Sequence, residues 1–547
     1  MKTDHLRLIR PEWGDWDAIR ERFAWNVPEF FNIAYVACDR HAQADGDRIA
    51  IYCENKDGSE RQYSFRQLKR LSNCLANVLR GHGVEKGDRV GIILPQRSET
   101  VISHMGIYKL GAIALPLSVL FGPEAVGYRL NNSGTKVVIT DTEHLELLES
   151  MRDQLPGLET IIDCDADNGF WSALDKASDE FEMVNTKSED PAYLVYTSGT
   201  TGPPKGALAP HRCLIGNLPG FEMSHNFFPQ EHDLFWTPAD WAWTGGLLDA
   251  LIPSLYYAVP VLGYDGGKFD PEKICHLLEK YRVRNAFIPP TALKMLRQVP
   301  GIREGYDIDM RSIMSAGESL GSELYHWGQE AFGVNINEMW AQTEFNYICG
   351  NCSAIMPVCP GSIGKSYPGH TVEPIDEEGN AVEVGAIGEL AADRDDPVMV
   401  SGYWKNEAAT QEKYVGKWWV TGDTGYKDEN GYIWFVGRKD DVISSAGYRI
   451  GPGEIEDCLL KHPAIAQVAV IGVPDEMRGE IVKAFVVLKP GEQASGELTE
   501  NIRSSVRRQL AAYEYPRIIE YIDDLPLTTT GKVKRNELRA RESRSDS

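Results

Sequence analysis

The sequence lacks any long hydrophobic run. No stretch approaches the roughly 18 uninterrupted apolar residues of a membrane-spanning helix. The opening residues, MKTDHLRLIRPEWGDW, carry charges where a signal peptide has its apolar segment. We therefore expect a cytoplasmic protein that has no stable association with a membrane.

An excess of positive charge is also missing. The chain of 547 residues has 56 Lys and Arg against 80 Asp and Glu, a formal net charge of −24. Proteins that bind nucleic acids or anionic lipid surfaces need a broad basic face. The composition argues against such partners and predicts that any polyanionic small molecule is met by a local basic site.

Cysteines are few, and their spacing does not complete a metal-binding pattern. Of ten cysteines, Cys349 and Cys352 form one C-x-x-C, but no second pair and no nearby histidine cluster completes a zinc site. Packing as reduced thiols is therefore favoured over metal or redox use. Internal repeats and long low-complexity tracts are absent as well, which excludes solenoid and fibrous architectures.

Short apolar runs alternate with amphipathic segments over most of the chain. The runs at 89–95, 112–117, 136–141, 192–197, 260–264, 285–290 and 312–317 read as strands, and segments such as 98–111 and 271–284 have helical spacing. This alternation predicts an α/β fold with parallel sheets covered by helices. Functional loops are then expected at the carboxyl ends of the strands.

The pattern changes after the charged segment around Asp440. Helical segments at 453–462 and 498–513 and strands at 466–472, 480–488 and 517–523 suffice for a small α+β domain. We expect a large domain over residues 1–439 and a small, mobile domain over 440–547, with Asp440 as the hinge.

A glycine-rich loop follows the run at 192–197. The stretch TSGTTGPPKG, residues 197–206, departs from the P-loop pattern at Pro204 and Gly206. Its prolines also remove backbone N–H donors on which a P-loop nest depends. The loop therefore predicts phosphate binding through hydroxyls and a lysine, with a plain surface connection as the alternative.

Five further motifs accompany this loop in a fixed order. Together they resemble the adenylate-forming superfamily of acyl-CoA synthetases, peptide-synthetase adenylation domains and firefly luciferase: Trp340–Glu344, Thr421–Asp423, Gly437–Asp441, Ala446–Ile450 and Pro526–Lys532. The segments 478–485 and 513–517 look most like those of short- and medium-chain acyl-CoA synthetases.

The resemblance implies a two-step reaction. ATP first joins the carboxylate to its α-phosphate, releasing pyrophosphate, and the thiol of CoA then displaces AMP. The first step brings two anions together, so cations are required. We expect a Mg²⁺ ion on Glu344 and catalytic roles for Lys532, Thr343 and Arg449.

The same resemblance assigns the ATP site. Thr197, Ser198, Gly199, Thr200, Thr201, Gly202 and Lys205 are expected to hold the β- and γ-phosphates, and Gly317, Glu318 and Ser319 to line the adenine. Asp423 is expected to accept hydrogen bonds from both ribose hydroxyls, with Arg438 beside it. Glu338, Trp340, Gln342, Thr343 and Lys532 complete the predicted set.

For the second step, the family swings its small domain about the hinge. Ala446, Gly447 and Tyr448 match the pantetheine path, and Arg478, Arg507, Tyr513 and Tyr515 match the CoA nucleotide site. A solvated helix face remains an equal reading for Arg507. No general base is expected because a CoA thiol supplies enough thiolate for an activated adenylate. His211 is interpreted as structural.

The sequence indicates less about the pocket that holds the acyl group. Ala341 stands where acetate-specific relatives have a tryptophan, which predicts a short to medium-chain or branched acid larger than acetate. Trp241 and Trp243 fall near the pocket and either shorten it or pack in the core. Alternatives are an aryl-acid CoA ligase, an enzyme that loads a carrier protein, and a binding-only protein. The oligomeric state, homo-oligomer included, and control by acetylation of Lys532 stay open.

Overall fold

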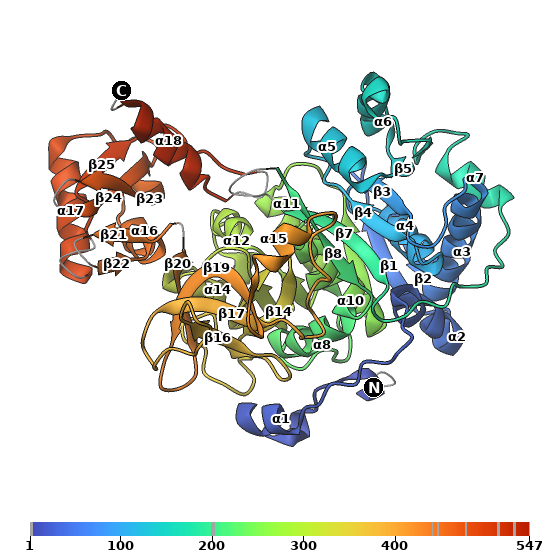
Figure 1. Ribbon diagram of the computed structural model, residues 1–547, viewed down its shortest axis with the longest axis horizontal. Coiled ribbons are helices and arrows are strands. Elements are labelled where there is room, and N and C mark those ends of the chain that lie inside the picture. The colour runs from blue at the N-terminus through green and yellow to red at the C-terminus, as the bar shows by residue number, and fades with distance from the viewer. Residues whose placement is uncertain are drawn as a thin grey trace.

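The computed structural model describes residues 4–197, 203–439, 441–445, 448–475, 478–510, 515–528 and 532–545. Figure 1 shows a large body built from the N-terminal part of the chain and a small C-terminal body, in red, beside it. In the described part of the chain, none of the helices combines the length and apolar character needed to cross a bilayer. The expected division into a large and a small domain is confirmed.

The central sheet of the large domain has nine strands. Their order is β15-β14-β13-β12-β11-β9-β10-β1-β2, and the pairs from β13 through β1 are parallel. The bounds are β1 Ile49–Glu54, β2 Glu60–Ser64, β9 Phe235–Trp236, β10 Val261–Tyr264, β11 Asn285–Phe287, β12 Ser312–Ser315, β13 Ile336–Gln342, β14 Phe345–Gly350 and β15 Lys365–Ser366.

A second sheet has six strands in the order β6-β5-β3-β4-β7-β8. All its pairs are parallel except β7 with β8. The bounds are β3 Arg89–Ile93, β4 Ile113–Pro116, β5 Val137–Thr140, β6 Thr160–Asp163, β7 Pro191–Thr197 and β8 Lys205–Pro210. The apolar runs predicted as strands are thus found in these two sheets, and the parallel α/β prediction is confirmed.

Helices cover both sheets. The longer ones are α3 Phe65–Gly81, α4 Ser98–Lys109, α5 Pro123–Ser133, α6 Thr142–Ser150, α8 Cys213–Ser224, α11 Pro271–Tyr281 and α14 Ser322–Phe332, with shorter α1 Trp16–Arg22, α2 Arg40–Asp45, α7 Phe170–Lys176, α12 Pro290–Leu296, α13 Ile302–Gly305 and α15 Glu407–Gln411. One buried apolar cluster contains Ile51 of β1, Val90 of β3 and Leu75 of α3. Burial of apolar surface therefore joins the two sheets into one body.

Helix α3 illustrates how local sequence sets an element boundary. The side chain of Ser64 accepts a hydrogen bond from the backbone N–H of Gln67, and the Gln67 side chain accepts one from the N–H of Ser64. This reciprocal pair is a capping box, which satisfies two donors that a helix start leaves free. The helix begins where the serine stands.

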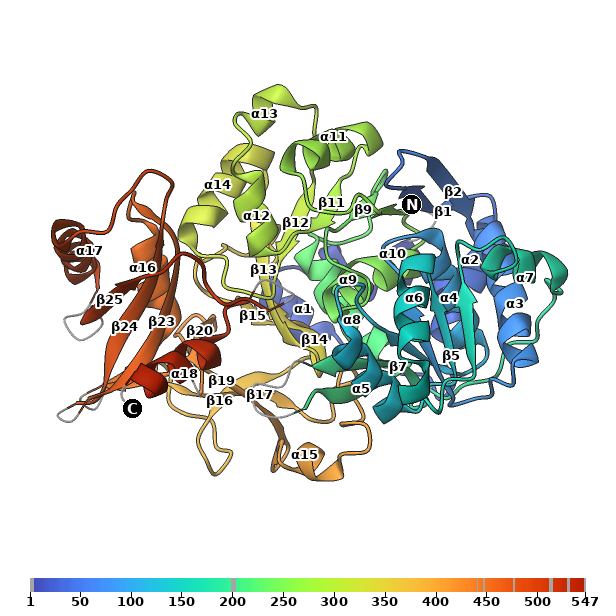
Figure 2. The ribbon, with the colours of Figure 1, turned by 90° about the horizontal axis from the view of Figure 1, so that it is seen from above.

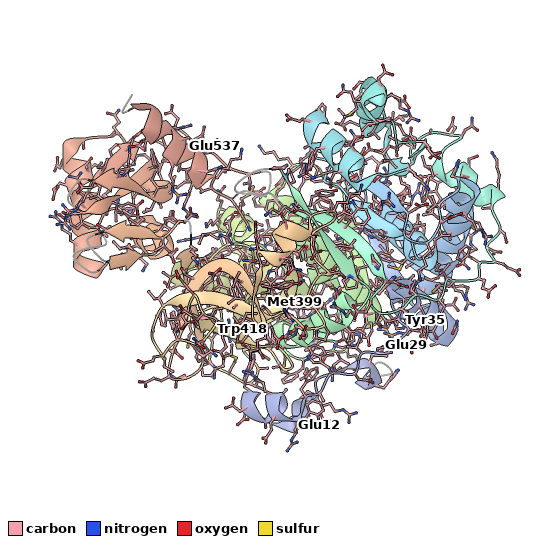
Figure 3. All side chains as sticks on the ribbon, in the orientation of Figure 1. Glu12, Glu29, Tyr35, Met399, Trp418 and Glu537 are labelled. Carbon is pink, nitrogen blue, oxygen red and sulfur yellow. The ribbon has the colours of Figure 1, made fainter. Side chains whose placement is uncertain are left out.

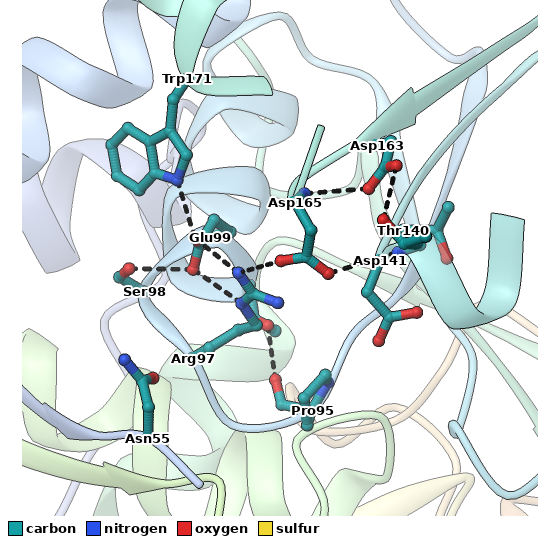
Figure 4. A network of polar contacts seen from close by, with 12 residues as sticks. Asn55, Pro95, Arg97, Ser98, Glu99, Thr140, Asp141, Asp163, Asp165 and Trp171 are labelled. Carbon is teal, nitrogen blue, oxygen red and sulfur yellow. Dashed lines mark hydrogen bonds and ion pairs between the residues drawn. The ribbon is translucent and has the colours of Figure 1, made fainter. Parts of the chain in front are cut away.

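The six-stranded sheet changes direction at β3, which has β4 on one side and β5 on the other. Such a point often binds a ligand. Here Arg97 pairs instead with Glu99 at 2.9 Å and Asp165 at 2.9 Å, and the Trp171 indole donates to Glu99 at 2.9 Å (Figure 4). Because Arg97 is committed to these two carboxylates, this network is interpreted as structural.

A third sheet of five strands completes the large domain. It contains β16 Val372–Ile375, β17 Gly388–Asp393, β18 Tyr414–Val415, β19 Trp418–Lys427 and β20 Ile433–Arg438. All its pairs are antiparallel, unlike the parallel sheets expected from the sequence, and short turns join β18 to β19 and β19 to β20. Figure 3 labels Met399 and Trp418 in this region of the large domain, and Glu537 on the small one.

The small domain is an α+β unit, as predicted. Its sheet holds β21 Ile443–Ser445, β22 Tyr448–Ile450, β23 Ile465–Asp475, β24 Gly479–Leu488 and β25 Ile518–Tyr521, with α16 Pro452–Leu460, α17 Gly496–Gln509 and α18 Arg535–Ser545. Figure 2 shows the segment before α18 extending toward the large domain. Asp440 lies outside the described residues, so the boundary at that position stays a prediction.

Candidate functional site

The glycine-rich loop joins two antiparallel strands. Thr197 ends β7, Lys205 begins β8, and the two residues are register partners. The sheet therefore fixes both ends of the predicted phosphate loop. Between them, the predicted phosphate contacts Ser198, Gly199, Thr200, Thr201 and Gly202 lie outside the described residues.

Lys205 is connected through Tyr403 to Glu344, the predicted metal ligand. Its ammonium lies 5.3 Å from the centre of the Tyr403 ring, and the Tyr403 hydroxyl donates a hydrogen bond to Oε1 of Glu344. Glu344 and Thr343 form the turn between β13 and β14, and the Glu344 carboxylate is buried. Within the described residues no donor reaches Oε2 of Glu344, so one carboxylate oxygen is uncommitted.

Asp423 is the most heavily bonded of the predicted site residues. Its Oδ2 accepts from the indole N–H of Trp340 at 3.0 Å and from the amide of Gln342 at 2.8 Å. Its Oδ1 accepts from Arg438 at 2.8 Å. The structure thus brings four predicted residues together. Both oxygens already have partners, so a ribose would use the lone pairs that remain on them. The expected position of Arg438 beside Asp423 agrees with this contact.

The predicted adenine residues lie after β12. Gly317 has φ +96°, a conformation that favours glycine, and a Cβ built there would meet no atom within 4 Å. The Thr291 hydroxyl donates to Glu318 at 3.2 Å, while Gly317 and Ser319 are exposed. This segment therefore presents an open backbone edge.

Glu338 of β13 lies beneath that edge. It is buried, its Oε1 accepts from the backbone N–H of Leu320 at 3.1 Å, and burial raises its pKa to about 8, with a smaller contribution from Asp457. The carboxyl is therefore neutral at neutral pH. Because Asp457 belongs to the small domain, the two domains meet beside the adenine segment.

Lys532 faces the same residues from the small domain. Its backbone forms a turn with Thr528, whose hydroxyl accepts the Lys532 N–H at 3.0 Å. Loss of water around the ammonium lowers the pKa of Lys532, and the carboxylates of Glu318 and Asp423 oppose that lowering. The residue retains exposed surface. A cation therefore stands opposite the Asp423 assembly, about a hundred residues away in sequence but adjacent in space.

The structure brings some of the predicted CoA-binding residues together. The Arg507 guanidinium lies 4.1 Å from the centre of the Tyr515 ring, and Arg517, not predicted, lies 5.3 Å from it. The pKa of Tyr515 is lowered, first by its hydrogen bond with Arg507 and also by Arg517 and Arg478. These groups form a basic cluster on an otherwise acidic protein.

Other predicted positions are described only in part. Ala446, Gly447 and Tyr513 lie outside the described residues, and Tyr448 and Arg449 are placed on β22 by their backbone, with Arg449 opposite Ser444. Their roles stay predictions.

The two tryptophans predicted near the acyl pocket differ in environment. Trp241 is fully buried and packs near Gly263 of β10, whereas Trp243 is half-buried and its ring meets Phe121 edge-on at 5.5 Å. Ala341 is half-buried on β13. Packing therefore accounts for Trp241, and its role in the pocket stays a prediction.

Some residues of the site carry no motif. Tyr403 was missed because a lone tyrosine in a loop gives no sequence signal, although it links Lys205 to Glu344. His211 is buried, and its Nδ1 accepts from the N–H of Ile33, consistent with a structural role. In the described ranges, no group of three or more His, Cys, Asp or Glu could hold a metal ion, and Cys349 and Cys352 are buried free thiols.

Comparisons with known proteins agree with the division into a large and a small domain. The family model described as AMP-binding enzyme matches residues 38–404, and the one described as AMP-binding enzyme C-terminal domain matches residues 454–532. The acetyl-coenzyme A synthetase of Bacillus subtilis is 38% identical over an alignment of 528 residues. The alignment covers 93% of this chain and 90% of that protein.

Two further proteins extend the likeness. The human mitochondrial acyl-coenzyme A synthetase ACSM4 is 35% identical over 563 residues, covering 100% of this chain and 96% of that protein. The crystal structure of the anthranilate CoA ligase AuaEII in complex with anthranoyl-AMP has a TM-score of 0.86 at 30% identity, covering 94% of this chain and 98% of the other.

Proposed function

Because this chain belongs to the AMP-binding enzyme family and is an acid–thiol ligase of the AMP-forming acyl-CoA synthetase type, we propose that it activates a short to medium-chain or branched carboxylic acid larger than acetate. A carboxylate oxygen attacks the α-phosphorus of ATP and pyrophosphate leaves. The CoA sulfur then attacks the acyl carbon and AMP leaves. The Asp423 assembly, with Lys532 facing it, carries this proposal.

In the first step, this chain's residues hold and neutralise the anions. Asp423, kept in place by Trp340 and Arg438, orients the ribose. Lys532 bridges the substrate carboxylate and the α-phosphate, where it stabilises charge that moves in the transition state. Thr197 and Lys205 hold the ends of the loop that binds the leaving phosphates.

The residues present fit a Mg²⁺ ion and CoA. Glu344 offers one uncommitted carboxylate oxygen, and Mg²⁺ takes one or two protein oxygens plus phosphates, so no larger ligand cluster is required. Bound there, Mg²⁺ would offset phosphate charge. The cluster of Arg478, Arg507 and Tyr515 suits the phosphates and adenine of CoA.

The preferred acid is inferred from position 341, where this chain has alanine and acetate-specific relatives have tryptophan. Ala341 is small and half-buried where a tryptophan would close the pocket behind a methyl group. The relatives compared include an enzyme named for acetate and one named for anthranilate, so an aryl acid is the second candidate.

The proposal is tested by incubating the protein with ATP, Mg²⁺, CoA and single acids. The panel is acetate, propionate, butyrate, isobutyrate, hexanoate and anthranilate. AMP and the thioester are measured by mass spectrometry, and kcat/KM is determined for each acid. We expect propionate to hexanoate to exceed acetate. Preference for acetate would overturn the acid assignment, and AMP without any thioester would favour transfer to a carrier protein.

Two further properties belong to this proposal. Lys532 retains exposed surface, so an acetyltransferase could reach it, and acetylation would remove the charge that the first step needs. Mass spectrometry of the purified protein after treatment with an acetyl donor would show whether loss of activity follows modification at this residue. A homo-oligomer is compatible with the proposed reaction and does not alter it.

A further inference from the structure

A buried carboxyl group lies near the predicted acyl pocket. Asp249 belongs to the π-helix η5, Leu247–Leu251, which precedes α10, Ile252–Tyr256, and the residue is 3% exposed. Its Oδ1 accepts a hydrogen bond from the side-chain amide of Asn346. Among the described residues no donor reaches Oδ2. One oxygen of a buried acid is therefore without a partner in the protein.

The position of this carboxyl is held from several sides. The Asn346 amide also donates to Asn217 at 2.8 Å, and Asn217 donates to the backbone carbonyl of Leu248 at 2.8 Å. Asn217 lies on α8, Asn346 on β14 and Leu248 on η5. This network fixes the direction in which Asp249 presents its second oxygen.

A purely structural role does not account for that oxygen. Burying a carboxyl group costs several kcal/mol unless its atoms are hydrogen-bonded, and burial raises the pKa of Asp249 well above its ordinary value. Native structures satisfy nearly all such groups, so this oxygen is open to a partner such as a water molecule or a substrate group. π-Helical turns are also frequent at functional sites.

The surroundings of Oδ2 show where the partner would come from. A Cβ built on Gly245 would lie 3.7 Å from Oδ2 of Asp249 and 2.9 Å from Cε1 of Phe287. Glycine at this position therefore keeps the space between the carboxyl and the ring clear of a side chain. The hydroxyl of Thr244, one residue earlier, is buried and also has no partner among the described residues.

This space is adjacent to the adenylation residues. Asn346, which bonds Asp249, follows Glu344 by two residues along the same chain segment. Phe287 ends β11, whose neighbour β12 leads into Gly317 and Glu318. Gly245 itself follows Trp243, which the sequence predicts near the acyl group. Asp249 is therefore linked through Asn346 and Gly245 to segments that the sequence assigns to the adenylation site and the acyl pocket.

We propose that Oδ2 of Asp249 forms a hydrogen bond with a hydroxyl or amino group on the acyl chain, so that the preferred substrate is a short hydroxy- or amino-substituted carboxylic acid. The inference rests on the proposed CoA ligase function and names its substrate class. A site built to bond a polar substituent discriminates strongly against the analogue that lacks it, because a buried polar group is then left unpaired.

The test compares matched acids on the same enzyme. AMP release and thioester formation are measured for butyrate, β-hydroxybutyrate, γ-hydroxybutyrate and γ-aminobutyrate. We expect at least one substituted acid to exceed butyrate in kcat/KM by about 10- to 100-fold, because butyrate leaves a buried polar oxygen unpaired. In Asp249→Leu this ratio is expected to fall below one, because butyrate then meets an apolar wall.

Two other variants separate recognition from folding. Gly245→Ala places a methyl group beside Oδ2 and is expected to lower the ratio while Asp249 stays in place. Ser254→Ala removes a buried hydroxyl without a partner from the following helix and is expected to leave the ratio unchanged. If Asp249→Leu does not fold, Gly245→Ala alone carries the comparison.

The outcomes distinguish two failures. Thioester formation with butyrate preferred, and a ratio that neither Asp249→Leu nor Gly245→Ala changes, would overturn the assignment of Asp249 and leave the CoA ligase function intact. If no acid of either panel yields a thioester, the proposed function fails, and this inference fails with it.

Discussion

At the scale of single residues, the site is organised around carboxyl groups in unlike environments. Asp423 is held by hydrogen bonds from Trp340, Gln342 and Arg438, which fix the orientation of its carboxylate. Glu338 has one backbone donor and is otherwise buried, which favours its neutral form. The same functional group is therefore hydrogen-bonded through both oxygens in one place and is buried and neutral in the other.

Glu338 predicts a pH dependence of ATP binding. Its pKa is raised from 4.5 to about 8, so the carboxyl ionises as the pH rises through about 8 and adds a negative charge beneath the predicted adenine segment, in the site of an anionic ligand. We expect the KM for ATP, measured by ATP–pyrophosphate exchange without CoA, to rise severalfold between about pH 7 and about pH 9. In Glu338→Gln this rise should be absent.

The same shift has a consequence for stability. A raised pKa means that the folded state binds the proton more tightly than the unfolded state, so the stability it contributes is full below about pH 4.5 and is lost as the pH rises to about 8. Glu338→Gln should therefore lose less thermal stability than the parent protein over that interval. Equal alkaline losses of stability in the two proteins would contradict the assignment.

At the scale of elements, α18 is tied to the start of the small domain. Arg539 pairs with Asp441 at 2.5 Å, and Arg535 pairs with Glu456 of α16 at 2.7 Å and lies 3.6 Å from Asp441. Glu456 also accepts the backbone N–H of Val470 at 2.7 Å. Because Arg535 follows Lys532 by three residues, this network positions the turn that carries Lys532 relative to Asp441, next to the predicted hinge.

Arg535 is therefore predicted to be a positioning residue for the first half-reaction. Arg535→Met leaves a buried carboxyl unpaired and loosens the turn, so we expect ATP–pyrophosphate exchange to fall about tenfold or more through kcat, with the KM for ATP little changed. Conversion of a supplied acyl-adenylate with CoA should be much less affected. Arg541→Met, on the exposed side of the same helix, is the control. An equal loss in both half-reactions would indicate a general folding defect instead.

At the scale of the whole molecule, the residues predicted for the reaction are divided between the two domains. The large domain holds Asp423 and Glu344, whereas Lys532 and the Arg507 cluster belong to the small domain. Lys532 stands at the adenylation residues in this structure, so the arrangement suits the first half-reaction. The CoA cluster then has to be brought to the adenylate, which requires a turn of the small domain about the predicted hinge at Asp440.

This division predicts complementary losses. Lys532→Ala should lower adenylate formation by about 10²- to 10³-fold, as removal of a preorganised donor does, and still convert a supplied adenylate to the thioester. Gly447→Leu should do the reverse by obstructing the predicted pantetheine path. ATP–pyrophosphate exchange and single-turnover thioester formation measure the two halves. If both variants lose the same half, the alternation of domains is wrong for this protein.

Much of this architecture could be predicted from the sequence. The apolar runs became β3, β4, β5, β7, β10, β11 and β12 because buried parallel strands are apolar over their whole length. The antiparallel sheet of β16–β20 was missed, since its mixed polar segments give little periodic signal. Tyr403 was missed for another reason: it acts only through Lys205 and Glu344, which lie far away in sequence. Arg517 was missed although it lies two residues from Tyr515, because a lone arginine just before a strand gives no specific signal.

Sequence alone determined the family and the chemistry, because motifs such as Trp340–Glu344 and Pro526–Lys532 carry the residue types that adenylation needs in a recognisable order. Only the tertiary structure decided which groups meet. Trp340 reaches Asp423 across 83 positions, and Asn346 reaches Asp249 across 97. Such contacts depend on how helices and sheets pack, and packing is a property of the whole chain that no local pattern specifies.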